Sequence, residues 1–133
     1  MSDVDILART IWGEARGEGS SGMTAVANVI MNRVRHPRWW GHDIENVCRT
    51  PYQFSAWNPG DPNLSKLLCV SIEDPQFLEA TKIAGDAVGG LLADNTCGAT
   101  SYYDASMIDN PPHWAIGRQP CARIGRLLLY RDT

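Results

Sequence analysis

One segment near the start of the chain restricts the possible folds more than any other. Residues 23–34, Met-Thr-Ala-Val-Ala-Asn-Val-Ile-Met-Asn-Arg-Val, are apolar or small on nearly every side of a helix. A helix that is apolar all round has to be buried, so other elements must pack around it. Pro37 predicts its end, because the residue before a proline disfavours helical backbone. The segment is therefore predicted to be a central core helix.

Three further helices are predicted along the chain. In residues 2–15 a capping serine precedes apolar side chains at helical spacing, and two glycines follow the segment. An Asp-Pro pair begins a similar pattern over residues 74–88, which a Gly-Gly pair ends. Residues 62–69 fit a shorter helix. The chain is thus predicted to be rich in helix.

The remaining segments are predicted to be irregular or extended. Residues 38–60 are rich in Trp, Gly, Pro and Asn, which is typical of a loop that forms a binding wall, with one weak strand or turn over residues 44–48. Residues 100–103 and 126–130 have β character and predict a small hairpin or two-stranded patch. The predicted fold class is mainly α (α+β).

Composition predicts one folded domain over residues 1–133. Apolar residues make up 44% of the chain and charged residues 20%, which is ordinary for a globular domain of this length. The net charge of −3 argues against a nucleic acid partner, which would need a broad positive surface. The basic cluster of Arg33, Arg35, His36 and Arg38 is interpreted as a solvated helix end, with a site for an anionic polymer as the alternative.

The N-terminal sequence does not resemble a secretory signal. It carries acidic residues where a signal needs positive charge, and no stretch approaches about 18 uninterrupted apolar residues. We therefore expect a protein made in the cytoplasm without membrane insertion.

The four cysteines lie too far apart for a zinc motif. Cys48, Cys69, Cys97 and Cys121 form no close pair, so disulfides or buried thiols remain as alternatives. A bridge between Cys97 and Cys121 would be the first to examine.

Glu14 is the first candidate for chemistry. Helical spacing places it on the flank of the apolar stripe, at the C-terminal end of its helix. Apolar neighbours and the negative helix end would both raise its pKa, which suits a general acid. A solvated flank glutamate remains the simpler interpretation of the spacing. Glu18 is either a second carboxylate or a turn residue that binds backbone amides.

Aromatic residues gather in the predicted loop. They stand beside Gln53, Ser55 and Asn58, a combination that suits N-acetylated sugars, since aromatic faces stack on sugar rings. An aromatic cluster that anchors the loop is the alternative. The aromatic residues are Trp39, Trp40, Tyr52, Phe54 and Trp57.

Other catalytic schemes find little support. His36, His42 and His113 are too scattered for a metal motif, so neither a metal nor a cofactor is predicted and a zinc amidase is disfavoured. No local signature supports a cysteine peptidase, and no phosphate-binding glycine loop or nucleophile elbow is found.

Several ordered motifs together resemble one known family. Residues 11–18 (Ile-Trp-Gly-Glu-Ala-Arg-Gly-Glu) and 22–34 closely resemble the SleB and CwlJ type of spore cortex-lytic enzymes and cell wall hydrolases. Residues 52–57 resemble the Gln-Phe-Ser segment of that family, residues 98–103 its Ala-Thr-x-Tyr-Tyr segment, and residues 124–131 its closing strand. The resemblance covers essentially the whole chain.

The resemblance implies a fold, an activity and a set of site residues. The family is similar to the lysozyme and lytic transglycosylase superfamily, which implies a lysozyme-like helical domain with a cleft for the peptidoglycan glycan strand. By this resemblance Glu14 is the catalytic residue. The residues that it implies for substrate binding are Glu18, Gln53, Phe54, Ser55, Tyr102 and Tyr103.

Two mechanisms follow from this resemblance. With Glu14 alone, the enzyme would be a lytic transglycosylase that cuts between N-acetylmuramic acid and N-acetylglucosamine. With a second carboxylate it would be a muramidase. The carboxylates considered for that role are Glu18, Asp43, Glu45 and Asp104.

The sequence also leads to expectations about the source of the protein and its partners. Without a signal or a wall-binding domain, the chain fits a monomeric phage endolysin that acts on the wall after release better than it fits a secreted bacterial enzyme. A peptidoglycan-binding module without activity is the alternative from another class.

Overall fold

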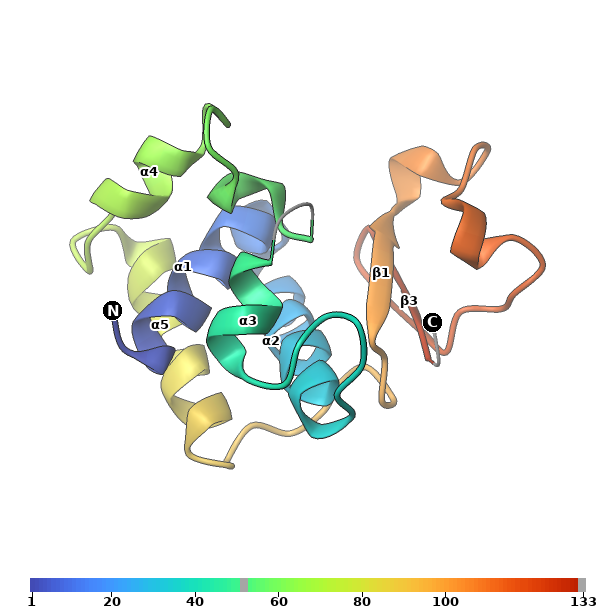
Figure 1. Cartoon of the computed structure of the whole chain (residues 1–133), viewed down its shortest axis with the longest axis horizontal. Coiled ribbons are helices and arrows are strands. Elements are labelled where there is room, and N and C mark those ends of the chain that lie inside the picture. The colour runs from blue at the N-terminus through green and yellow to red at the C-terminus, as the bar shows by residue number, and fades with distance from the viewer. Residues whose placement is uncertain (51–52, 132–133) are drawn as a thin grey trace.

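The computed structural model describes residues 1–50 and 53–131, in which a group of helices lies beside a small sheet (Figure 1). Four short 3-10 helices, η1 (Arg16–Glu18), η2 (Ser55–Trp57), η3 (Ala105–Met107) and η4 (His113–Ala115), lie between the main elements. The α-helices are α1 (Asp3–Ala15), α2 (Gly19–Arg35), α3 (Ile44–Arg49), α4 (Leu64–Cys69) and α5 (Pro75–Val88).

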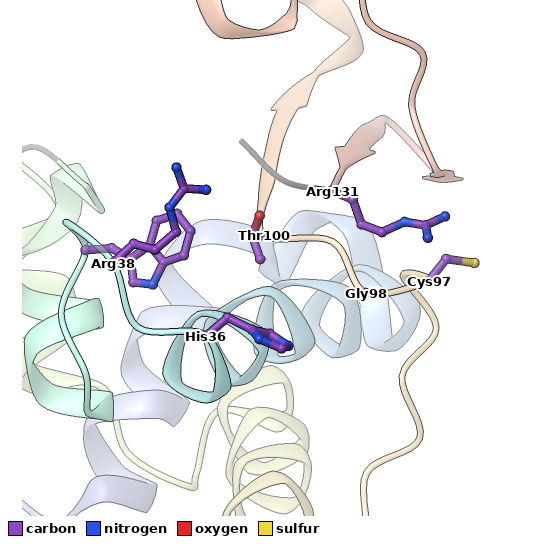
Figure 2. A pocket seen from close by; sticks show the side chains of 7 residues that line it. His36, Arg38, Cys97, Gly98, Thr100 and Arg131 are labelled. Carbon is purple, nitrogen blue, oxygen red and sulfur yellow. The ribbon is translucent and has the colours of Figure 1, made fainter.

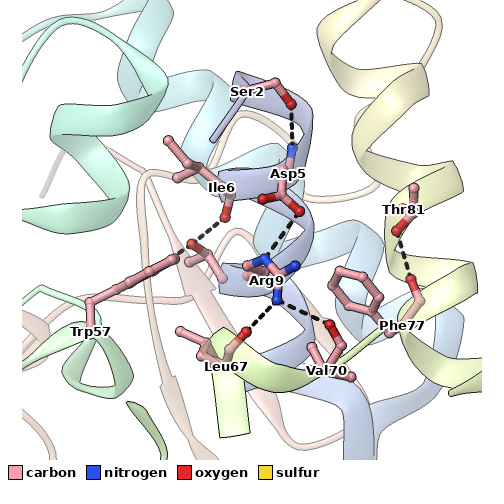
Figure 3. Close-up of polar contacts among 10 residues, drawn as sticks. Ser2, Asp5, Ile6, Arg9, Trp57, Leu67, Val70, Phe77 and Thr81 are labelled. Carbon is pink, nitrogen blue, oxygen red and sulfur yellow. Dashed lines mark hydrogen bonds and ion pairs between the residues drawn. The ribbon is translucent and has the colours of Figure 1, made fainter. Parts of the chain in front are cut away.

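The predicted helix starts are confirmed at atomic detail. The Ser2 hydroxyl accepts a hydrogen bond from the Asp5 backbone N–H (3.1 Å) at the start of α1 (Figure 3). The Asp74 carboxylate accepts from the N–H groups of Gln76 and Phe77 at the start of α5. Each cap satisfies backbone donors that have no partner within the helix, and so fixes where the helix begins.

The central position of α2 is confirmed as well. Helix α2 packs against α1 and α5, and most of its residues from Gly22 to Arg33 are buried. The helix begins at Gly19, four residues before the predicted segment. None of the helices in residues 1–50 and 53–131 is both long enough and apolar enough to cross a membrane.

The predicted strand or turn over residues 44–48 is wrong, because the segment is helix α3. Asp43 caps it by accepting a hydrogen bond from the Asn46 N–H (2.7 Å). Ile44, Val47 and Cys48 then share the buried face of the helix. Three residues at spacings of three and four are enough to bury one turn of helix against α1 and α2.

The sheet has one strand more than predicted. Strands β1 (Ser101–Asp104), β2 (Ala122–Ile124) and β3 (Leu127–Tyr130) are antiparallel in the order β1-β3-β2. Tyr102 pairs with Leu129 across β1 and β3, and Ala122 pairs with the same residue from the other side. All four residues of β3 are buried, because helices cover one face of the sheet and a second apolar cluster (Tyr103, Ala115, Leu128 and Tyr130) covers the other.

The four cysteines are free thiols, so no bridge joins Cys97 to Cys121. The two residues are nevertheless neighbours, since the Cys121 thiol donates a hydrogen bond to the carbonyl of Thr96 (3.3 Å).

Candidate active site

Glu14 lies half-buried in the last turn of α1. Burial raises the pKa of its carboxyl group from 4.5 to about 7, and the negative charge of Asp61 adds to this shift. Within the part of the chain that the structure describes, no residue donates a hydrogen bond to the Glu14 carboxylate. A carboxyl group in this state can hold its proton near neutral pH and release it to a bound molecule, as a general acid must.

Asp61 is a functional candidate that the sequence analysis missed. It lies in the loop between η2 and α4, where its carboxylate accepts a hydrogen bond from the Asn63 N–H (2.8 Å). Both sides of this loop contact α1 next to Glu14: a Cβ placed on Gly13 would lie 3.6 Å from Ala56 Cβ and 2.5 Å from Leu67 Cδ1. An isolated aspartate in a Pro- and Asn-rich loop gave no signal of this contact.

Two hydrogen bonds attach the neighbouring segment to α1. Trp57 Nε1 donates to the Thr10 hydroxyl (2.8 Å), one turn before Glu14. Arg9 Nη1 donates to the carbonyls of Leu67 and Val70, which fixes the end of α4 against the same helix (Figure 3). The segment that carries Asp61 is therefore attached to α1, the helix of Glu14, on both sides.

Tyr102 approaches Glu14 from the sheet. Burial raises the pKa of the Tyr102 hydroxyl well above 10, and the negative charge of Glu14 raises it further, while Arg33 opposes both. The phenol therefore keeps its proton at physiological pH and can donate a hydrogen bond. The family resemblance predicts Tyr102 in the cleft, and in the structure the charge of Glu14 acts on its hydroxyl.

Arg33 links α2, the loop and the sheet. Its Nε donates to the Thr100 carbonyl and its Nη1 to Gln53 Oε1, both at 2.6 Å. Its guanidinium carbon also lies 5.2 Å from the ring centre of Trp40 and 5.7 Å from that of Phe54. These contacts compensate a cation that is only 8% exposed.

The interpretation of Arg33 as part of a solvated helix end is thus wrong. Burial lowers the pKa of its guanidinium, while the neighbouring Tyr102 and Cys48 act in the opposite direction. The flat, weakly hydrated guanidinium group can be buried among rings and carbonyls where an ammonium group would not fit as well.

The predicted loop residues have different environments. Gln53 accepts from Arg33 and donates from Nε2 to the Trp40 carbonyl (3.2 Å), so its amide group holds the loop in place. Phe54 is buried. Ser55 is exposed at the start of η2, where its hydroxyl faces solvent. Among these three residues, Ser55 is therefore the one best placed to touch a ligand.

The predicted aromatic cluster is divided between buried and exposed positions. Trp40 and Trp57 are buried, and each indole N–H has a hydrogen-bond acceptor inside the protein. Trp39 is 67% exposed and lies edge-on to Trp40. Tyr52 lies outside the described residues. Most of these rings therefore anchor the loop, and Trp39 is the one open to solvent.

Two predicted site residues lie away from Glu14. Tyr103 points to the opposite face of β1 and stacks on Tyr130 in the second apolar cluster, with ring centres 5.7 Å apart. Glu18 accepts a hydrogen bond from the Arg126 N–H (3.4 Å) at the turn between β2 and β3. Of the two roles considered for Glu18, the structure therefore fits the turn residue that binds backbone amides.

Cys48 lies near this centre but is not poised as a nucleophile. Burial raises the pKa of its thiol to about 12, so the thiol stays protonated at neutral pH. In residues 1–50 and 53–131, no three His, Cys, Asp or Glu side chains are grouped as metal ligands would be.

Comparison with known sequences gives one family and several relatives. Residues 17–130 match the family model described as Cell Wall Hydrolase, and the match begins three residues after Glu14. The spore cortex-lytic enzyme of Bacillus subtilis is 30% identical over 129 residues, which cover 94% of this chain and 36% of that protein. The corresponding enzyme of Halalkalibacterium halodurans is 30% identical over 125 residues, which cover 94% of this chain and 33% of that protein. The chain spans about a third of the length of these two relatives.

Comparison with solved structures confirms the fold. The catalytic domain of the Bacillus cereus SleB protein has a TM-score of 0.70 and 26% identity, over 97% of this chain and 89% of that domain. The catalytic domain of the germination-specific lytic transglycosylase SleB from Bacillus anthracis has a TM-score of 0.68 and 27% identity, over 97% of this chain and 93% of that domain. The mainly helical α+β fold with its small antiparallel sheet is that of these catalytic domains.

Proposed function

Because this chain belongs to the cell wall hydrolase family, we propose that it cleaves peptidoglycan glycan strands as a lytic transglycosylase with Glu14 as acid and base. The cut falls between N-acetylmuramic acid and N-acetylglucosamine. The observation that carries the proposal is the half-buried Glu14 carboxyl group, with its pKa of about 7 and no hydrogen-bond donor among the described residues. One similar solved domain comes from a lytic transglycosylase.

The first step transfers the proton of Glu14 to the glycosidic oxygen. The bond between that oxygen and C1 of muramic acid then breaks, which leaves an oxocarbenium-like centre and an ionised Glu14. Because burial disfavours the ionised carboxylate, Glu14 keeps its proton near neutral pH and has it available for this transfer. Asp61 strengthens the same tendency through its charge.

The second step returns the proton to Glu14. Its carboxylate takes the proton of the muramoyl 6-hydroxyl while O6 attacks C1, which gives a 1,6-anhydromuramic acid end and restores the enzyme. No water is consumed, so one carboxyl group is sufficient. Tyr102 can donate a hydrogen bond to the reacting sugar, and the exposed Ser55 hydroxyl is placed to hold an N-acetyl group.

A muramidase is the second candidate, and Asp61 favours it. Hydrolysis needs a second carboxylate to activate water or to form a covalent intermediate. The carboxylates considered from the sequence each have another contact: Asp43 caps α3, Asp104 pairs with Arg126 (3.1 Å), and Glu18 accepts from the β2–β3 turn. Glu45 is exposed on α3. Asp61 is the carboxylate whose charge acts on Glu14.

Mass spectrometry of the fragments released from purified peptidoglycan tests the proposal. In heavy-oxygen water, wild-type protein should release anhydro ends without the heavy isotope, whereas a muramidase would release labelled reducing ends. Glu14→Gln should release neither, and Glu73→Gln, an exposed glutamate, serves as the matched control. Free stem peptides with intact strands would indicate an amidase. An undiminished Glu14→Gln variant would contradict the role of Glu14.

A further inference from the structure

A cavity of about 340 Å³ lies at the end of α2. His36, Arg38 and Arg131 are among the residues that line it, together with the buried Trp40 and Thr100. Figure 2 shows Arg38 and Arg131 on opposite sides, with Thr100 between them and His36 below. The floor is thus fixed by the core, and the rim carries basic side chains.

The cavity is positively charged. Three of its seven lining residues are basic, and none of the seven is acidic. Two of the last carbonyls of α2 already have donors, because Arg33 O accepts from Trp40 Nε1 (2.9 Å) and Asn32 O accepts from the His36 N–H (3.0 Å). The Asp94 carboxylate does not line the cavity and accepts hydrogen bonds from the Gly98 N–H and other donors.

Both arginines lie against other residues at the rim. The Arg38 guanidinium carbon lies 5.3 Å from the ring centre of Trp40. The Arg131 stem runs past Gly98, where an added Cβ would lie 3.6 Å from Arg131 Cδ. Side chains positioned in this way lose less conformational freedom when they bind an anion, and guanidinium groups match the two oxygens of a carboxylate.

The cavity adjoins the candidate active site. Thr100 and Tyr102 are two residues apart on an extended segment, so they share one face at a spacing of about 7 Å. Trp40 contributes its ring to the cavity and its carbonyl to Gln53. Arg33 binds the Thr100 carbonyl between the two places. The cavity and the candidate active site therefore share one stretch of the chain, with Thr100 in the first and Tyr102 beside the second.

We propose that this cavity binds a carboxylate of the peptidoglycan stem peptide. The inference rests on the proposed function, because a muramic acid bound beside Glu14 carries its peptide on a flexible lactyl group. Stem peptides end in carboxylates, and the cavity offers the basic side chains of His36, Arg38 and Arg131 on the side of Thr100, two residues before Tyr102. The cavity would then favour strands with peptides over bare glycan.

Direct binding tests the cavity without catalysis. The probes are a stem tripeptide with free carboxylates and the same peptide with every carboxylate amidated. Binding of each probe is measured from the NMR shift of the Trp40 indole N–H. Wild-type protein should bind the free acid at least tenfold more tightly than the amide. The Arg38→Gln/Arg131→Gln variant should lose this preference, and Lys82→Gln on the exposed part of α5 should keep it. Equal affinity for the two peptides, or tighter binding of inorganic phosphate, would overturn the proposal.

Cleavage gives an independent result. On strands with peptides, the double arginine variant should show a KM about tenfold higher with kcat unchanged, while strands stripped of peptides should be cut as by wild type. An equal loss on both substrates would overturn the peptide assignment. If wild-type protein cuts neither substrate, the proposed function fails, and the binding measurement still decides the cavity.

Discussion

Tyr102 and Tyr103 are adjacent in β1, but their side chains lie on opposite faces of the sheet. Tyr102 packs against the helical core, where the charge of Glu14 raises its pKa. Tyr103 stacks on Tyr130 and meets Trp114 edge-on at 6.0 Å between ring centres. The alternation of a strand thus separates two neighbouring tyrosines into a site residue and a core residue.

Removing the two hydroxyl groups should therefore have different effects. Tyr102→Phe should lower kcat by about tenfold to a hundredfold, because a hydrogen bond to the reacting sugar would be lost. Tyr103→Phe should leave kcat within about threefold and cost roughly 1 kcal/mol or less of stability, since its hydroxyl accepts one long hydrogen bond, from the Tyr130 hydroxyl at 3.4 Å. Turnover on purified glycan strands and urea unfolding measure these effects. Equal losses of kcat would contradict the separation.

Asp61→Asn should move the pH profile to lower pH. Glu14 acts as an acid only while protonated, so a pKa of about 7 predicts that kcat/KM falls as the pH rises above that value. Removing the negative charge of Asp61 lowers the pKa of Glu14, although burial keeps it above 4.5. The fall should begin at lower pH than in wild type or in the Asp109→Asn control. An unchanged profile would show that Asp61 does not act on Glu14.

Glu14→Gln should stabilise the protein at high pH. The folded-state pKa of Glu14 is raised from 4.5 to about 7, so ionisation of this group opposes folding. The cost is absent below pH 4.5, grows as the pH rises through this range, and is complete above pH 7, at up to about 3 kcal/mol. Urea unfolding at pH 4, 6 and 8 should show the advantage of the variant increasing with pH. A constant difference at all three values would argue against a raised pKa.

Arg33→Lys should be costly although it keeps the charge. A lysine cannot make both 2.6 Å contacts to Thr100 and Gln53, and its ammonium group is harder to bury. We expect a loss of about 2–4 kcal/mol in unfolding free energy and a lower kcat, because the loop and the sheet lose their shared anchor. Arg35→Lys, at an exposed position two residues on, should change the unfolding free energy by less than about 0.5 kcal/mol. Similar values for the two variants would refute the anchoring role.

Gly13→Ala should destabilise the contact between α1 and α4. The new Cβ would lie 2.5 Å from Leu67 Cδ1, in a region where Leu67 is fully buried. Such overpacking costs about 1–3 kcal/mol. Gly85→Ala, where nothing lies within 4 Å on helix α5, should instead stabilise by up to about 1 kcal/mol.

A double-mutant cycle checks the cause of this loss. Gly13→Ala combined with Leu67→Ala should cost less than the sum of the two single changes, because the second removes the atom that clashes. Additive losses would mean that another contact limits this position.

Local signals explain which elements the sequence could predict. The starts of helices α1 and α5 can be predicted from Ser2 and Asp74, because each capping side chain bonds a backbone N–H only two or three residues away. Helix α3 has the same kind of cap at Asp43, but its single buried turn is too short to separate from a strand by spacing. Strand β2 is three residues long and forms only because β3 is beside it.

The site depends on long-range packing, so less of it was predictable. Glu14 follows from its spacing and from the family resemblance. Arg33 looks solvated in the sequence because its partners Thr100 and Gln53 are far along the chain. The charge of Asp61 acts on Glu14 across more than forty residues of sequence, in a loop whose flanking residues Ala56 and Leu67 lie beside Gly13.

The order of strands in the sheet has a consequence for biosynthesis. Strand β3 pairs with both β1 and β2 but follows both along the chain, and β1 has no other partner strand within the described residues. As a ribosome releases the chain, the helices and Glu14 emerge first, while Tyr102 waits for residues 127–130 before its strand can pair. A nascent or prematurely terminated chain therefore carries Glu14 before the strand of Tyr102 has its partner, and the candidate site is complete only once residues 127–130 have been made.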